Sequence, residues 1–164
     1  MPIISTDIHY RLSGGAANSN DEASLGGIKS NTTVSGTVLD DVSGAESAAG
    51  SVEYRCFYVH NNHATLSLTL AAIYFQALTL GVGHAVAIGV GSAAINGTEQ
   101  TVANETTVPV GVAFSSPVTL GTALALGSIP AGQHKAVWVR RTVTGGSAAS
   151  ANNYTLRTTG DTAA

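Results

Sequence analysis

Leucine alternates with hydroxyl-bearing residues in the stretch 65–70, and this pattern restricts the chain to β-structure. Leu66, Leu68 and Leu70 occupy every second position, between Thr and Ser. Successive side chains of an extended strand point to opposite faces, so the three leucines share one face and enter one core. A helix would distribute them around its circumference. The stretch therefore predicts a strand that continues to Phe75.

The residues before this stretch predict a second strand, over 52–59, whose second half is buried on both sides. Phe57 and Val59 make one face apolar. The other face carries the alternating side chains of Val52, Tyr54, Cys56 and Tyr58. The sequence His-Asn-Asn-His at 60–63 follows, and Asn tolerates the left-handed backbone angles of tight turns. We therefore predict that 52–59 and 65–75 form a central antiparallel hairpin.

Further strand-like segments follow at regular intervals, with Gly, Pro and Asn turn signals between them. They are residues 85–90, 98–102, 108–114, 118–126, 135–143 and 154–159. The turn signal Asn96-Gly97 predicts that 98–102 pairs back on the preceding strand. No segment predicts a convincing amphipathic helix. The chain is therefore predicted to be all-β, an antiparallel β-sandwich of about seven or eight strands, with a closed barrel as the alternative.

Residues 1–51 differ from the β-sandwich domain that we predict over 52–164. Two patches in this region are dense in Gly, Ala, Ser and Asn, a composition that cannot bury a core of its own. We predict an extended, glycine-rich N-terminal arm and linker that becomes ordered on a neighbouring subunit, with a flexible tail as the alternative. The apolar residues expected to make the contacts are Ile8, Tyr10, Leu12, Leu25 and Ile28.

The chain carries very little charge. Charged residues make up 10 % of it, whereas an ordinary soluble domain has roughly 25 %. A neutral surface is poorly protected against association, so this composition indicates packing against partners or copies of itself. The seven Lys and Arg residues form no basic run and the net charge is −3. A nucleic-acid partner is therefore not expected.

No Asp, Glu, Lys or Arg occurs between Arg55 and Glu99, a length sufficient to span a bilayer. The segment is interrupted by Thr, Ser, Gln76, His84 and glycines, and it alternates where a spanning helix would be continuously apolar. Buried strands explain it better, and we expect no membrane partner. The N-terminus lacks the basic and apolar regions of a signal peptide, which predicts synthesis in the cytoplasm.

The chemistry-bearing residues form no recognisable catalytic or ligand set. The lone Cys56 lies in an apolar strand and is interpreted as a small buried hydrophobe. His60 and His63 lie three residues apart in a turn, but no Asp, Glu or Cys flanks them to complete a metal site. Asp40-Asp41 lacks the alternating acidic spacing of a calcium loop, and no nucleophile motif is present. We therefore expect a protein that is not an enzyme and has no catalytic residue, cofactor or metal.

Several segments, which together span nearly the whole chain, resemble small virion structural proteins of tailed bacteriophages. They are Arg-Leu-Ser-Gly-Gly-Ala-Ala-Asn (11–18), Ala-Ser-Leu-Gly-Gly (23–27), Val-Ser-Gly-Ala-Glu (42–46), Val-Glu-Tyr-Arg-Cys-Phe-Tyr-Val (52–59), Asn-Gly-Thr-Glu-Gln-Thr-Val (96–102) and Ile-Pro-Ala-Gly-Gln-His-Lys-Ala-Val-Trp-Val-Arg-Arg (129–141). Among such proteins the head decoration, or cement, type fits best.

The resemblance implies a β-rich domain that binds the outside of the capsid and stabilises the shell, with an arm that ties neighbouring capsomers. The implied partners are the major capsid protein and neighbouring copies of the chain, and the implied location is the virion. A tail, fibre or head-to-tail joining component is the alternative within the same class. Two other classes stay open: a carbohydrate-binding or receptor-binding β-module, and a metal-dependent hydrolase that uses the histidines.

Overall fold

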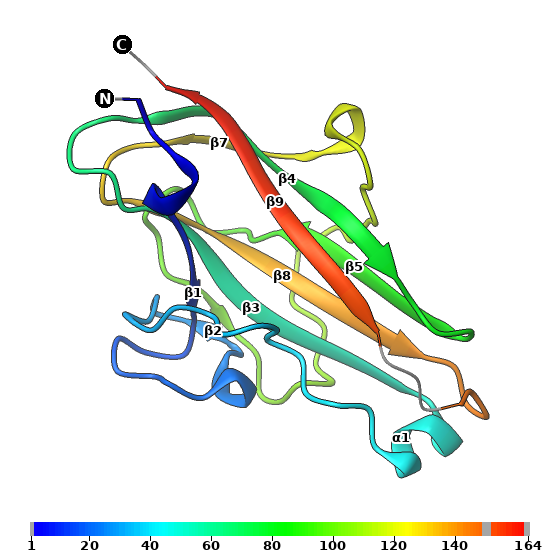
Figure 1. The fold of residues 1–164 in the computed structure, drawn as a ribbon. Coiled ribbons are helices and arrows are strands. Elements are labelled where there is room, and N and C mark those ends of the chain that lie inside the picture. The colour runs from blue at the N-terminus through cyan, green and yellow to red at the C-terminus, as the bar shows by residue number, and fades with distance from the viewer. Residues whose placement is uncertain (1, 149–151, 163–164) are drawn as a thin grey trace.

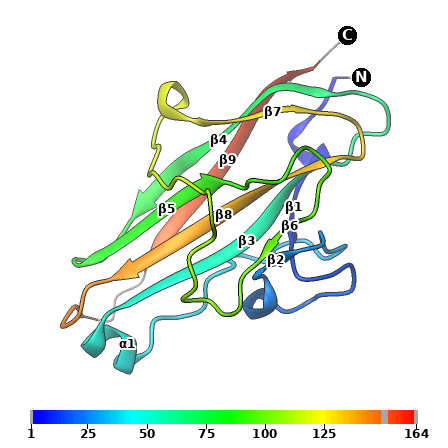
Figure 2. The same cartoon turned by 180° about the vertical axis from the view of Figure 1, so that it is seen from behind.

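The protein is a sandwich of two antiparallel β-sheets, seen from two sides in Figures 1 and 2. The computed structural model describes residues 2–148 and 152–162. One sheet has four strands in the order β1 (Ile8–Leu12), β3 (Ser51–Asn61), β8 (His134–Val143) and β5 (His84–Val90). The other has three, in the order β7 (Leu124–Ile129), β4 (Leu68–Thr79) and β9 (Asn153–Thr162). The predicted all-β antiparallel sandwich is confirmed.

The main core lies between the two sheets. Phe57 and Val59 of β3 meet Ile73 and Phe75 of β4 in one buried apolar cluster. The inward side chains of β9 pack against this cluster. Its other members come from β1, β4, β5, β7 and β8 and from residues 38–39: Leu12, Val38, Leu39, Leu68, Ala71, Val86, Ile88, Leu126, Ile129, Val137 and Val139. Alternate residues of each strand supply these side chains, as the period of two requires.

The outer face of the four-stranded sheet is covered by irregular segments and not by a sheet of comparable size. Cys56, Tyr58 and Trp138 are fully buried there, beneath Leu25 and Phe114. A small sheet of β2 (Gly26–Gly27) and β6 (Glu99–Thr101) lies in this layer. Both faces of β3 are therefore buried, as its apolar pattern predicted, and Cys56 is a buried free thiol.

The predicted central hairpin is wrong, although both of its strands exist. β3 pairs with β1 and β8, and β4 pairs with β7 and β9, so the two strands belong to opposite sheets. Residues 62–67 carry the chain from one sheet to the other, and the His63 ring nitrogen Nδ1 accepts the amide of Leu66 at 3.0 Å. Because both strands carry core-facing side chains, they pack face to face instead of pairing edge to edge.

The alternation of inward and outward side chains along β4 is interrupted at Leu70. Its backbone is left-handed there, with φ of 50°, and the side chain is 76 % exposed. The register with both neighbours shifts at the same place, which is the signature of a β-bulge. The expected alignment of Leu66, Leu68 and Leu70 on one face therefore fails, because the inward positions after Leu68 are Ala71, Ile73 and Phe75.

The glycine-rich N-terminal arm is not confirmed. Residues 8–12 form β1, which is a strand of the four-stranded sheet in register with β3 from Ile8 opposite Asn61 to Leu12 opposite Phe57. Gly26 lies so close to β6 that a Cβ atom there would be 1.8 Å from the carbonyl oxygen of Gln100. The small residues thus allow close backbone packing within this chain, where composition alone had indicated an arm.

Three further expectations are corrected. Residues 99–101 pair with β2 and not with the preceding strand, and 108–114 contain no strand. The small-residue stretch before β3, which we predicted to be part of the linker, contains a short helix, α1 (Gly44–Ala49). Ser43 and Glu46 form a capping box that stabilises its start. Three short 3-10 turns also occur, η1 (Ser5–Asp7), η2 (Asp21–Ala23) and η3 (Leu120–Thr122). No helix in the described part of the chain is long and apolar enough to cross a membrane.

Leu12 and Ile28 provide a direct test of where the N-terminal region belongs. Leu12 is 1 % exposed and Ile28 is 57 % exposed. We expect Leu12→Ala to lower the free energy of unfolding by about 2–5 kcal/mol, because it leaves a core cavity. Ile28→Ala should change it by less than about 0.5 kcal/mol. Urea unfolding measures both, and equal small effects would show that β1 is not part of the folded unit.

Candidate functional site

A groove runs along β9, and at one end it also reaches Leu68 and Gln76 of β4. Three adjoining hollows of about 400, 230 and 640 Å³ follow this strand from Asn152 to Gly160. The first and second share Tyr154, and the second and third share Tyr10 and Leu156. We call this feature the β9 groove. Its opposite wall is formed by residues 3–5 and 34–42.

The groove exists because the two sheets differ in width. The four-stranded sheet continues past β9 through β3 and β1, as Figure 1 shows. Phe57 of β3 and Tyr10 of β1 therefore line the groove as its floor. Two hydroxyl pairs cross it: Tyr10 with Thr158 at 3.0 Å, and Tyr154 with Thr37 at 2.8 Å. The groove is thus apolar at its base, with hydroxyl groups along its sides.

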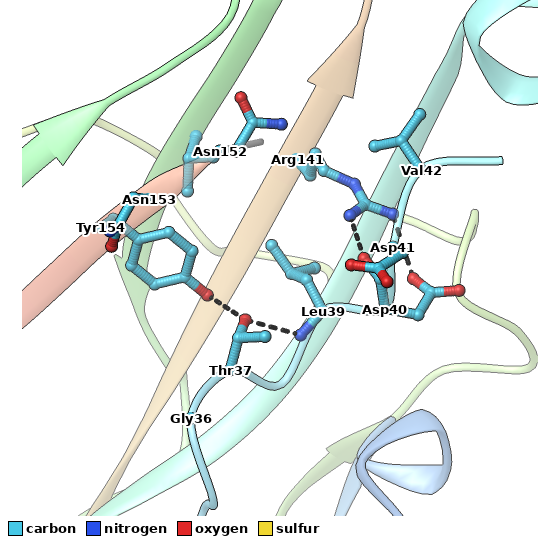
Figure 3. Close-up of a pocket in the computed structure, with 11 residues that line it drawn as sticks. Gly36, Thr37, Leu39, Asp40, Asp41, Val42, Arg141, Asn152, Asn153 and Tyr154 are labelled. Carbon is cyan, nitrogen blue, oxygen red and sulfur yellow. Dashed lines mark hydrogen bonds and ion pairs between the residues drawn. The ribbon is translucent and has the colours of Figure 1, made fainter. Parts of the chain in front are cut away.

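A buried arginine closes the first hollow of the groove (Figure 3). Arg141 of β8 is 4 % exposed, and its Nη2 lies 2.6 Å from Oε2 of Glu53 and 3.0 Å from Oδ1 of Asp40. It also donates to the Asp40 carbonyl oxygen. A charge at this depth requires such partners, since an unpaired buried guanidinium would be costly. Asp41, in the same hollow, is exposed.

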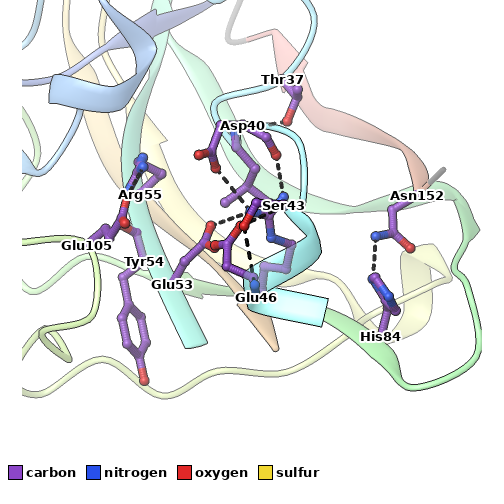
Figure 4. A network of polar contacts seen from close by, with 12 residues as sticks. Thr37, Asp40, Ser43, Glu46, Glu53, Tyr54, Arg55, His84, Glu105 and Asn152 are labelled. Atoms are coloured by element: carbon purple, nitrogen blue, oxygen red, sulfur yellow. Dashed lines mark hydrogen bonds and ion pairs between the residues drawn. The ribbon is translucent and has the colours of Figure 1, made fainter. Parts of the chain in front are cut away.

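The carboxyl groups of Glu53 and Glu46 lie near each other (Figure 4), and their pKa values are shifted in opposite directions. Burial, and then the hydrogen bond to Glu46, raise the pKa of Glu53 to about 7. The same bond, helped by Ser43 at the start of α1, lowers the pKa of Glu46 to about 2. Glu53 Oε1 is buried and has no hydrogen-bond partner among the described residues. Glu53 therefore holds its proton more tightly than Glu46 does.

A second surface is formed by residues 108–122, which we call the crossing segment because it joins the two layers. Its Ser115 pairs with Ile88 of β5 through two backbone bonds, of 2.8 and 3.0 Å. Two residues later, Pro117 accepts the amide of Phe75 in β4 at 2.8 Å. Gln100 fixes its start, with side-chain bonds to the backbone of Val110 at 2.7 and 2.8 Å. The segment is held near its start and in its middle.

The crossing segment exposes apolar side chains and contains no charged residue. Val110 is 79 % exposed and Leu120 is 61 % exposed, and Val108 and Val118 are exposed as well. Single exposed apolar residues are ordinary, but four on one ordered, uncharged segment make it a candidate contact surface. This surface is on the β5 and β4 side of the sandwich, away from the β9 groove.

Three histidines form a row across the four-stranded sheet. His9 of β1 lies opposite His60 of β3, and His60 lies opposite His134 of β8. Burial, and then the nearby charge of Lys29, lower the pKa of His60 to about 4. The pKa of His134 is lowered by the same causes. Both rings are therefore neutral at pH 7, and no group of His, Cys, Asp or Glu within residues 2–148 and 152–162 is arranged to hold a metal ion.

The structure places the five predicted contact residues in three different environments. Ile8, Tyr10 and Leu12 lie on β1, where Leu12 is in the main core and the Tyr10 ring packs edge-on against Phe57. Leu25 helps to cover the outer face of the four-stranded sheet. Ile28 alone is mostly exposed. These residues therefore form no common surface, although Ile8 and Tyr10 line the β9 groove.

Sequence reasoning missed both surfaces. The alternating apolar residues at 108–114 predict a strand at the start of the crossing segment. In the structure, Val112 and Phe114 pack inward, whereas Val108 and Val110 face solvent. Pro109 was the available signal against a strand. The β9 groove had no local signal, since its walls come from segments more than a hundred residues apart.

The comparisons with known proteins give no relative. No protein-family model, no curated protein and no solved structure matches the chain.

The raised pKa of Glu53 predicts an unusual dependence of stability on pH. Between pH 4.5 and about 7 the folded state keeps the Glu53 proton that the unfolded state has released, so this carboxyl group makes stability fall as pH rises. Glu53→Gln keeps a donor and cannot ionise. We expect its stability relative to the original protein to rise by up to about 3 kcal/mol from pH 4.5 to 7.

The measurement is urea unfolding at each pH, with Glu22→Gln as a control that removes one carboxylate from an exposed turn. The control should show no such trend. A Glu53→Gln difference that stays constant across this range would mean that Glu53 is ionised in the folded protein at pH 4.5 as it is at pH 7.

Proposed function

We propose that this protein is a structural component of a virion, of the kind that decorates the outside of a tailed-phage head and stabilises the shell. The observation that carries the proposal is the crossing segment, an ordered and uncharged surface with four exposed apolar side chains. The resemblance of the sequence to virion structural proteins supplies the biological setting. The partner at this surface is the major capsid protein.

The energetics of a shell suit such a surface. Each apolar side chain removed from water contributes about 1.5–3 kcal/mol. Docking costs several kcal/mol of lost translational and rotational freedom, so a single small contact is weak. Repetition of the same contact over many lattice sites multiplies the gain for the assembled shell. A surface poor in charge supports this role, because few ions must be stripped of water when it is covered.

The location of the protein separates this proposal from its alternatives. Virions of the phage that encodes the chain are labelled with gold-conjugated antibody against the folded protein and viewed by electron microscopy. We expect label over the whole head. Label confined to the neck or tail would reject decoration and make the chain a joining or fibre component.

Charge placed in the crossing segment should abolish attachment without unfolding the protein. The double variant Val110→Asp, Leu120→Asp introduces two carboxylates at exposed positions. We expect it to bind capsids stripped of the protein more than tenfold more weakly, because an unpaired carboxylate would be buried at the interface. Co-sedimentation with the capsids measures binding.

The control is Val82→Asp, a residue 95 % exposed in the turn between β4 and β5. It carries the same substitution outside the crossing segment and should bind normally. Loss of binding in both proteins would indicate a general effect of charge, and normal binding by the double variant would remove the crossing segment from the interface.

A further inference from the structure

We propose that the β9 groove binds an extended polypeptide segment of a partner protein, which adds as a fourth strand to the three-stranded sheet. The proposal concerns a surface separate from the crossing segment and holds whether or not the protein decorates a phage head. It rests on the free edge of β9, the shape of the groove and the charges at its ends.

The free edge of β9 is long and accessible. The strand has ten residues and pairs only with β4 among the described strands. None of its residues makes a backbone hydrogen bond with a described segment on the other side. Proteins usually protect such edges with charge, proline or a covering segment. Here β9 has no proline and only two charged residues, Arg157 and Asp161. The neighbouring segments 3–5 and 34–42 contact it through the side chains of Thr162 and Tyr154, and they leave its outward backbone groups unpaired.

The groove beside this edge has the form that a strand would fill. A partner strand paired with β9 points alternate side chains to the same side as Tyr154, Leu156 and Thr158. These β9 side chains line the three hollows, so the partner's inward side chains would enter the hollows too. The floor offers Tyr10 and Phe57, which indicates that apolar side chains fit best. The added strand would also match the four strands of the opposite sheet.

A second copy of β9 does not fit this space. Antiparallel pairing of two β9 strands about a two-fold axis would place both sandwiches on the same side of the joined sheet. The four-stranded sheet already extends beyond β9 through β3 and β1 (Figure 1). The two copies of these strands would then occupy the same volume. A slender segment without a second layer avoids this conflict.

The charges specify the partner further. Arg157 forms no salt bridge with the described residues and projects from the outer face of β9, where an acidic residue directly opposite would complement it. At the other end, the carboxyl groups of Asp40 and Asp41 outnumber the single Arg141. An antiparallel partner therefore carries an acidic residue near its start, apolar residues at alternate positions and a basic residue at its end.

The probe is an acetylated, amidated heptapeptide, Val-Glu-Val-Thr-Val-Thr-Lys, which places Glu opposite Arg157 and Lys beside Asp41. Isothermal titration calorimetry with the full chain gives the affinity, and amide hydrogen exchange locates the contact. We expect one-to-one binding and slower exchange at alternate β9 residues, because every second amide of an edge strand points outward. Absence of binding at millimolar peptide would overturn the proposal.

Two N-methylated peptides distinguish strand addition from simple insertion of apolar side chains. One is methylated at the three Val amides, and the other at Glu and the two Thr. Strand pairing requires that one set abolishes binding and the other leaves it intact, since only alternate amides face β9. Equal effects of the two sets would reject the added strand.

Charge exchange tests the register. Arg157→Glu should weaken binding of the Glu-containing peptide between about threefold and tenfold, and the peptide with Lys in place of Glu should recover it. Lys29→Glu, the same change on the far side of the four-stranded sheet, should leave binding unchanged.

A protein that dimerises through β9 in analytical ultracentrifugation and excludes the peptide would identify a second copy as the occupant and overturn the proposal.

Discussion

The burial of β3 and β8 on both faces is the constraint on which the rest of the structure depends. Their central residues, from Tyr54 to Asn61 and from Ala136 to Val139, are fully enclosed. A sheet that is buried on both faces needs two covering layers. Outside the four-stranded sheet, the described part of the chain has only the three strands β7, β4 and β9 for this purpose. These strands cover one face. Irregular segments cover the other, and hydrogen bonds of 2.7 Å from the amides of Cys56 and Tyr54 to Ser24 and Glu105 hold them there.

Both candidate surfaces follow from this shortage of strands. The three-stranded sheet is narrower than the four-stranded sheet, so residues 34–42 cover part of the inner face of β3 and β1. The β9 groove lies between these residues and β9. The crossing segment has to link the two covering layers around the β5 side, and its outward residues then have no layer above them. The molecule thus presents one incomplete sheet edge and one apolar strip, two features suited to contacts with other chains.

The polar groups inside the sandwich are arranged to avoid unpaired charge. Arg141 lies between Asp40 and Glu53, and burial raises the pKa of Glu53, which favours its neutral form. This network joins the end of β8 to α1 and to the segment before it, so the covering segment 34–42 is anchored by ion pairs as well as by Val38 and Leu39. Removal of one member would leave a buried charge, which costs more than the pair contributes.

The sequence by itself determined the all-β class and most of the long strands. Period-two alternation is a local property, and it located β3, β5, β8 and β9 within a few residues and identified Cys56 as buried. It did not determine which strands pair. The alternating patterns of β3 and β4 are compatible with pairing in one sheet and equally with packing face to face in two sheets. The bulge at Leu70, the inclusion of residues 8–12 in a sheet and the β9 groove were decided only by the tertiary structure. Each depends on backbone and side chains distant in sequence, whose packing no local pattern records.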